Sequence, residues 1–165
     1  MRRSFVRLQY NSPVVLTFAL LSLGALFLGI VTDGATTRQF FSVYRAPLTD
    51  LWAWPRFVLH VLGHSSYSHY IGNMMMILVV GPPLEEKYGS RSLFWAIFLT
   101  ALISGLVQWL FFPGTALLGA SGIAFMMIRR FQFRGNSQCR ANTQNLYQHR
   151  VVQIEWLHES PLVFC

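Results

Sequence analysis

Polar side chains that could do chemistry are concentrated in one short stretch of a largely apolar sequence. The stretch is HVLGHSSYSHYIGNMMM, at residues 60–76. His60 and His64 are four residues apart, as are His69 and Asn73, and residues at this spacing share one face of a helix. On such a helix His69 and Asn73 would both point into a bundle, where they could donate hydrogen bonds to one oxygen atom.

Spacing alone leaves three interpretations of this stretch open. In the first, the histidines and Asn73 satisfy backbone carbonyls and hold the helices together. In the second, His60, His64 and the methionines at 74–76 bind Cu(I) or Zn, although three consecutive methionines point in three directions around a helix and make a poor ligand set. In the third, His69 and Asn73 form an oxyanion hole, which requires a nucleophile elsewhere in the protein.

Ser121 is the candidate nucleophile, and it stands in LLGASGIAFMMIRRFQF, residues 117–133. A serine among small residues is weak evidence by itself, because small residues also let membrane helices pack closely. GASG also departs from the GxSxG elbow of soluble hydrolases, since Ile123 occupies the last place. Its combination with the histidine–asparagine pair is more specific than the serine alone.

The composition indicates a membrane protein. Charged residues make up 12% of the 165 residues and hydrophobic residues 53%, whereas a soluble domain has about 25% charged residues. The net charge of +7 could suggest nucleic acid, but the arginines are dispersed between apolar stretches. We therefore expect the lipid bilayer as a partner, and no nucleic acid. Cys139 and Cys165 form neither a CxxC motif nor a disulfide framework, and we expect no metal and no cofactor.

Four uncharged apolar runs predict an all-α, polytopic transmembrane helix bundle. Crossing the hydrocarbon core takes about 20 apolar residues, with a range of ~17–25. After residue 128 the composition changes abruptly to a polar sequence rich in Arg, Gln and Asn. We expect an incomplete membrane domain of about four spans at residues 1–128, and a polar tail at residues 129–165 that is disordered or out of frame. The predicted spans are Val14–Val31, Tyr70–Leu84 with an extension back to His60, Ser92–Phe112 and the shorter Gly114–Ile128.

The arginines predict the orientation of these spans, because Lys and Arg are enriched in cytoplasmic loops. Arginines precede the first span at positions 2, 3 and 7, and follow the fourth at positions 129, 130 and 134. Glu85 to Arg91 would form a cytoplasmic turn between the second and third spans. We therefore expect a multi-pass integral membrane protein with a cytoplasmic N-terminus. The outer segment at residues 46–59 would lie along the membrane surface.

Taken together, these motifs resemble the rhomboid family of intramembrane serine proteases. The resemblance covers residues 5–128, and the motifs occur in the family's order. The histidines at 60 and 64, with the HxxxN of His69 and Asn73, are similar to the family's second-helix signature. LGASG, residues 118–122, is similar to the nucleophile motif at the start of the fourth helix.

Two further places carry the resemblance. GPPLEEKYGS, residues 81–90, is similar to the turn after the second helix, with Glu85 and Gly89 at matching positions. Arg56 resembles an arginine of the outer loop, but Pro55 stands where a tryptophan is often found.

The resemblance implies a six-helix core and a Ser–His dyad that hydrolyses peptide bonds in or near transmembrane segments. It makes Ser121 the nucleophile, and it makes His69 and Asn73, with the Ser121 backbone N–H, the oxyanion hole. Transmembrane proteins would be the substrates or clients, and no cofactor is implied. Supporting roles fall to His60 and His64 beside a polar cavity, to Gly119 and Gly122 where substrate backbone approaches, and to Arg56 and Glu85.

The chain departs from the family pattern at the general base. That base is a histidine on the sixth helix, and this sequence has no fifth or sixth span. His149 and His158 are the only histidines after Ser121, and both lie in the polar tail. We therefore expect an impaired protease. The alternatives are a non-catalytic membrane binding protein and a non-functional, truncated or frameshifted fragment.

Overall fold

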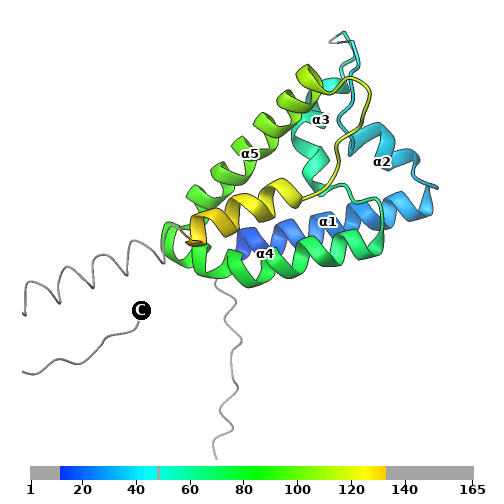
Figure 1. The fold of residues 1–165 in the computed structure, drawn as a ribbon. Coiled ribbons are helices and arrows are strands. Elements are labelled where there is room, and N and C mark those ends of the chain that lie inside the picture. Colours follow the sequence, from blue (N-terminus) through cyan, green and yellow to red (C-terminus); the bar gives the residue numbers. More distant parts are fainter. Residues whose placement is uncertain (1–11, 48, 133–165) are drawn as a thin grey trace, which may run out of the picture. The chain divides into compact units, whose positions relative to one another are not determined.

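The computed structural model describes residues 12–47 and 49–132 of the chain. Within these ranges the fold is a bundle of helices (Figure 1), as the sequence predicts. The chain divides into a compact unit of residues 1–128 and a second unit of residues 129–165. The elements are α1 (Pro13–Val31), α2 (Ala35–Phe40), α3 (Ala53–Leu59), the short 3₁₀ helix η1 (His60–Leu62), α4 (Tyr67–Tyr88), α5 (Ser90–Phe111) and a last helix over residues 121–132.

Two of the predicted spans, α1 and α5, are long and apolar enough to cross a membrane. The second predicted span is wrong at its start, because the chain is extended at Gly63 and α4 begins only at Tyr67. The fourth is wrong as well, since residues 112–120 are not helical and the last helix begins at residue 121. The predicted turn between Glu85 and Arg91 shrinks to Gly89, where φ is +80°.

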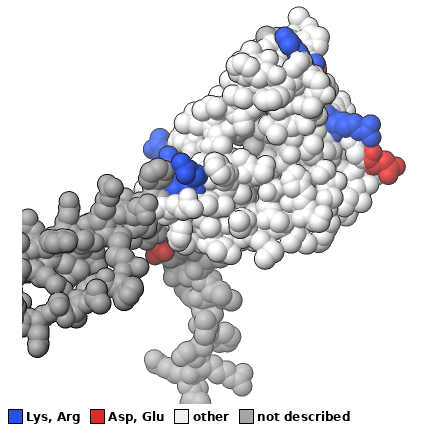
Figure 2. All heavy atoms as spheres, viewed as in Figure 1, with Lys and Arg blue, Asp and Glu red and all other residues white. Residues whose placement is uncertain are grey.

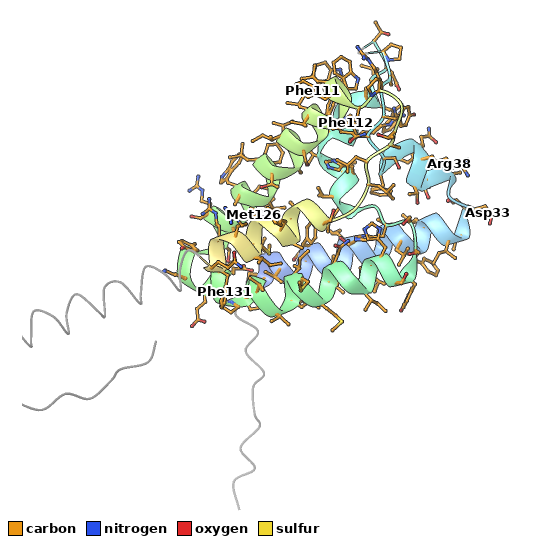
Figure 3. The ribbon with its side chains drawn as sticks, viewed as in Figure 1. Asp33, Arg38, Phe111, Phe112, Met126 and Phe131 are labelled. Carbon is orange, nitrogen blue, oxygen red and sulfur yellow. The ribbon has the colours of Figure 1, made fainter. Side chains whose placement is uncertain are left out.

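The bundle packs α1 against α4 and α3 against α5. Gly105 permits the second contact, because a Cβ there would lie 2.7 Å from the carbonyl oxygen of Phe57. Many large apolar side chains of α1 and α5 stay exposed. In Figure 2 the charged side chains gather at the ends of the described fold and leave the middle of the visible face uncharged. Figure 3 places Asp33 and Arg38 beyond the end of α1. This surface suits a protein whose sides face the hydrocarbon core of a bilayer.

Glu85 joins the end of α4 to the start of α1. Its side chain is only 2% exposed. Its two carboxylate oxygens accept from the backbone N–H groups of Val14 at 2.9 Å and Val15 at 3.0 Å. The first N–H groups of a helix have no partner within the helix, so this carboxylate caps α1 from another helix. Pro13, at the start of α1, has no N–H to satisfy.

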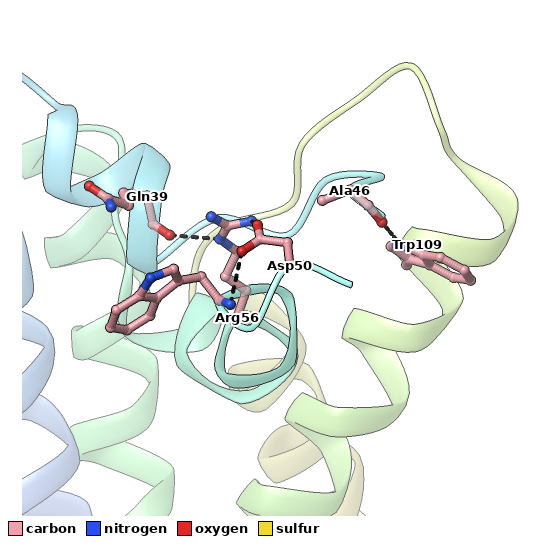
Figure 4. A network of polar contacts seen from close by, with 6 residues as sticks. Gln39, Ala46, Asp50, Arg56 and Trp109 are labelled. Carbon is pink, nitrogen blue, oxygen red and sulfur yellow. Dashed lines mark hydrogen bonds and ion pairs between the residues drawn. The ribbon is translucent and has the colours of Figure 1, made fainter. Parts of the chain in front are cut away.

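Arg56 organises the irregular segment between α2 and α3 (Figure 4). Its Nε donates to the carbonyl oxygen of Gln39 at 2.6 Å, and its Nη1 pairs with Asp50 at 3.1 Å. The guanidinium also lies over the ring of Tyr44, 4.7 Å from its centroid. The indole N–H of Trp109 in α5 donates to the carbonyl oxygen of Ala46 at 3.1 Å. These contacts fix the segment that holds Val43, which the candidate site uses.

Candidate active site

The start of α4 is set by Ser66, and this start puts His69 in the first turn. The Ser66 hydroxyl accepts from the backbone N–H of His69 at 3.2 Å, which makes Ser66 the N-cap. Asn73 follows one turn later on the same helix. The histidine and the amide therefore lie one above the other on α4, as their spacing predicts.

His69 and Asn73 converge on the backbone of Gly119. A Cβ on Gly119 would lie 2.7 Å from Cε1 and 3.0 Å from Nε2 of His69. The same Cβ would lie 3.9 Å from Nδ2 of Asn73. Gly119 has φ +120°, a conformation that L side chains rarely adopt. Only glycine satisfies both the conformation and the close approach, so this position brings α4 against the segment leading to Ser121.

The amide of Asn73 has an unused donor. Asn73 is 9% exposed, and its Nδ2 has no hydrogen-bond partner among the described residues. A buried donor left unpaired costs about 1–3 kcal/mol. Such a group in a native site calls for an explanation. A negatively charged oxygen bound near Gly119 would satisfy it.

The hydroxyl of Ser65 contacts the imidazole ring of His69. The hydroxyl of Ser65 lies 3.2 Å from Nδ1 of His69. If that hydroxyl donates, Nδ1 is the acceptor, and the neutral ring carries its proton on Nε2. Nε2 is one of the two ring atoms that face Gly119. In this tautomer His69 and Asn73 both present donors near the same backbone position.

Ser121 is the first residue of the last helix, two residues after Gly119. The segment before it is held by backbone pairing rather than by helix. Val43 and Leu117 exchange two hydrogen bonds, at 2.9 and 2.8 Å, and the Gly119 N–H donates to the carbonyl oxygen of His60 at 2.9 Å. Ser121 is exposed, and no hydrogen bond joins its hydroxyl to a histidine within residues 12–47 and 49–132.

His60 and His64 do not share a helix face, contrary to the prediction from their spacing. His60 belongs to η1, is 1% exposed, and bridges the carbonyl of Arg56 at 3.3 Å and the hydroxyl of Ser104 at 3.2 Å. His64 lies in the extended link before α4 and contacts the carbonyl of Leu62 through Nδ1 at 3.1 Å. Both histidines thus contact backbone carbonyl oxygens, as the first of the three interpretations proposes for them.

His64 also packs behind the pair on α4. Its ring centroid lies 5.2 Å from that of His69 and 5.4 Å from that of Tyr70, edge to face in both cases. Its Nε2 has no partner among the described residues. Neither Ser65 nor Ser104 was predicted as a site residue from the sequence. Ser65 stands four residues before His69, a spacing that could have indicated it, whereas nothing in the sequence connects Ser104 to His60.

The metal interpretation finds no support in the part of the chain that the structure describes. No group of three or more His, Cys, Asp or Glu residues there could hold a metal ion. Met74 is 3% exposed, whereas Met75 and Met76 are 64% and 50% exposed. The three sulfur atoms therefore do not face one site.

The remaining candidate residues lie away from this convergence or outside the described ranges. Arg56 and Glu85 act in the scaffold, through the contacts given above. A Cβ on Gly122 would meet nothing within 4 Å, so the described neighbours do not require a glycine there. His149 and His158 lie outside the described residues, as does nearly all of the predicted polar tail.

Comparisons with known proteins agree on one family. The family model of the rhomboid domain matches residues 51–157. A Rhomboid protease GlpG homolog of Cronobacter sakazakii is 26% identical over 164 residues, which cover 91% of this chain and 58% of the relative. Rhomboid protease GlpG of Pectobacterium atrosepticum is 27% identical over 131 residues, or 79% of this chain and 46% of the relative. Rhomboid-like protease 3 of Toxoplasma gondii is 29% identical over 87 residues, or 53% and 33%. The chain thus spans about a third to three-fifths of the length of these relatives.

Proposed function

Because the chain belongs to the rhomboid family of membrane proteins, we propose that it carries the nucleophile and the oxyanion hole of an intramembrane serine protease. The observation that carries the proposal is the convergence of His69 and Asn73 on Gly119, two residues before Ser121. The names of the relatives, which are proteases, support the same reaction.

The proposed reaction begins when the hydroxyl oxygen of Ser121 attacks the carbonyl carbon of a peptide bond. The carbonyl oxygen becomes an oxyanion, and His69, Asn73 and the backbone N–H of Ser121 donate hydrogen bonds to it. Donors held in place before the reaction stabilise such charge without reorganising, and one of them is worth about 2.7–4 kcal/mol in soluble proteases. The substrates would be membrane proteins, cut in or near a transmembrane segment.

This reaction also needs a base. A serine hydroxyl is a poor nucleophile unless an adjacent base takes its proton, and no histidine is hydrogen-bonded to Ser121 among the described residues. Loss of one member of a catalytic triad costs on the order of 10⁴–10⁶ in rate. Without such a base the chain would hydrolyse its substrates slowly.

A second candidate function follows from the same observation. A chain with an exposed serine and no histidine bonded to it among the described residues can still hold a transmembrane client, because binding needs no proton transfer. In this case the protein is a non-catalytic membrane binding protein.

Reconstitution with a transmembrane substrate separates the two functions. The chain and its Ser121→Ala variant are placed in liposomes with the substrate, and product and bound substrate are both measured. The protease proposal expects slow product formation that Ser121→Ala abolishes, with binding unchanged. Binding without any product that depends on Ser121 would favour the second function. Fast cleavage would contradict the impairment.

A further inference from the structure

An apolar groove runs along the outside of the bundle, away from the candidate active site. It has a volume of about 480 Å³ and lies between α1, α5 and the α3–η1 segment. Thr17 and Leu21 of α1 line one side, and Phe94, Phe98 and Ala101 of α5 line the other. Apart from Thr17, all its lining residues are apolar. The groove joins the two helices that are apolar enough to span a membrane, so its surroundings are hydrocarbon.

The groove runs from one end of the bundle toward its middle. Its α1 side begins at Pro13, at the end of the bundle where Glu85 of α4 caps α1. It stops at Ala101 on the α5 side, just before Gly105 meets Phe57 of α3. From Pro13 to Leu21 a helix rises ~12 Å, and half of the hydrocarbon core is ~15 Å. The groove therefore extends through about one leaflet.

These dimensions fit a hydrocarbon chain better than a protein helix. A volume of about 480 Å³ over ~12 Å gives a mean cross-section of ~40 Å², about half that of a helix ~10 Å across. One acyl chain is narrower than a helix and, like the groove, extends through about one leaflet.

Arg91 supplies a positive charge near the end of the groove where α5 begins. Residues 91, 94, 98 and 101 are spaced by three, four and three along α5, so they share one helix face. Arg91 therefore lies one turn beyond Phe94, at the edge of the groove that faces the membrane boundary. It is exposed and makes no ion pair with any residue in the described ranges. Figure 2 shows Lys and Arg side chains gathered at the end of the fold where α5 begins.

We propose that this groove is a binding site for an anionic glycerophospholipid, with one acyl chain between α1 and α5 and the phosphate on Arg91. Guanidinium groups bind phosphate in a two-pronged geometry, and basic pockets between membrane helices bind anionic head groups. A second copy of this chain is disfavoured as the occupant. A second copy in the same orientation would bring its own Arg91 to the same boundary, where like charges repel each other.

Photo-labelling in a defined bilayer tests the proposal. The full chain is placed in phosphatidylcholine nanodiscs with a small fraction of phosphatidylglycerol that carries a diazirine at the end of one acyl chain. Leu20 and Leu21 form a matched pair, since they are 58% and 55% exposed and only Leu21 lines the groove. The chain end should react with Leu21, Phe98 and Ala101 and much less with Leu20.

Substitutions test the acyl-chain site and the head-group contact separately. Thr17→Trp, which fills the groove, should remove most labelling at Leu21, whereas Leu20→Trp on the neighbouring face should not. If Thr17→Trp does not fold, Thr17→Leu is the smaller filling. Arg91→Gln should lower labelling by phosphatidylglycerol about fivefold, the effect of one basic residue near an anionic head group. Lys87→Gln, at the same end but outside the groove, should leave it unchanged.

Three results would overturn the proposal. If Leu20 and Leu21 are labelled equally and Thr17→Trp does not change the labelling, the probe reports only bulk lipid around the protein and no lipid bound in the groove. If phosphatidylcholine and phosphatidylglycerol probes label the groove equally and Arg91→Gln has no effect, the groove does not select an anionic head group. If native mass spectrometry shows a dimer that Thr17→Trp dissociates, the occupant of the groove is a second copy of the chain.

Discussion

At the scale of single residues, the site depends on Gly119 having no side chain. Gly119→Ala would place a Cβ against the imidazole of His69 and hold alanine at φ +120°. Strain of this kind costs about 1–3 kcal/mol, so we expect a lower melting temperature in detergent. Gly72→Ala is the matched control, since a Cβ in that helical position would meet nothing within 4 Å. The control should be neutral or stabilising, and equal melting temperatures for the two variants would contradict the close approach.

The tautomer of His69 is a second prediction at this scale. Because the Ser65 hydroxyl lies 3.2 Å from Nδ1 and can donate to it, we expect the neutral ring of His69 to carry its proton on Nε2. Nitrogen-15 NMR of labelled histidine distinguishes the two tautomers. Ser65→Ala should shift the population toward the Nδ1–H form, whereas Ser68→Ala should not, because the Ser68 hydroxyl bonds to that of Ser66 and not to His69 within the described ranges. An Nδ1–H ring in the unmodified protein would show that Nε2 cannot donate to an oxyanion in the neutral state.

At the scale of elements, α1 begins at a carboxylate that α4 supplies. Glu85→Ala removes the acceptor of two backbone N–H groups at this helix start. Leaving buried donors unpaired costs about 1–3 kcal/mol each, so the free energy of unfolding should fall by at least that amount. Glu86→Ala changes the same charge at an exposed neighbour and serves as the control. Equal unfolding curves in a denaturant titration would show that the cap contributes nothing.

Element starts are also where the sequence predictions failed. Apolar runs located α1 and α5 within two residues, because hydrophobicity decides where a chain can cross a membrane. The start of α4 was placed too early, since Gly63 is extended against Phe41 and Ser66 caps a new helix. The start of the last helix was also placed too early, because residues 117 and 119 pair with Val43 and His60 instead. Such partners are far away in sequence and leave no local pattern.

At the scale of the whole molecule, the arrangement across the membrane is a prediction from the arginines. Fusions of a side-specific reporter after residue 40 and after residue 140 should report opposite sides, with the N-terminus in the cytoplasm. The first position is at the end of α2, and α1 is the one predicted span before it, so this fusion tests that span. Reports from the same side would contradict the four-span arrangement.

The candidate site was more predictable than the scaffold around it. The one-turn spacing of His69 and Asn73 and the small residues before Ser121 indicated a shared site. Gly119 lies against both side chains of the pair. The contacts of His60 with Ser104, and of Glu85 with α1, came only from the fold. A side chain's partner in another helix depends on how the helices pack, which spacing within one helix does not specify.

The central claim, that Ser121 is a nucleophile with His69 and Asn73 as its oxyanion donors, is tested most directly by chemical rescue. The measurement is the rate at which a fluorophosphonate labels the chain as imidazole is added as an external base. We expect little labelling without imidazole, a rate that rises with its concentration, and none in Ser121→Ala. Asn73→Ala should lower the rescued rate by on the order of 10²–10³ without a matching fall in melting temperature. Rescue that is unchanged in Asn73→Ala, or labelling that persists in Ser121→Ala, would contradict the account.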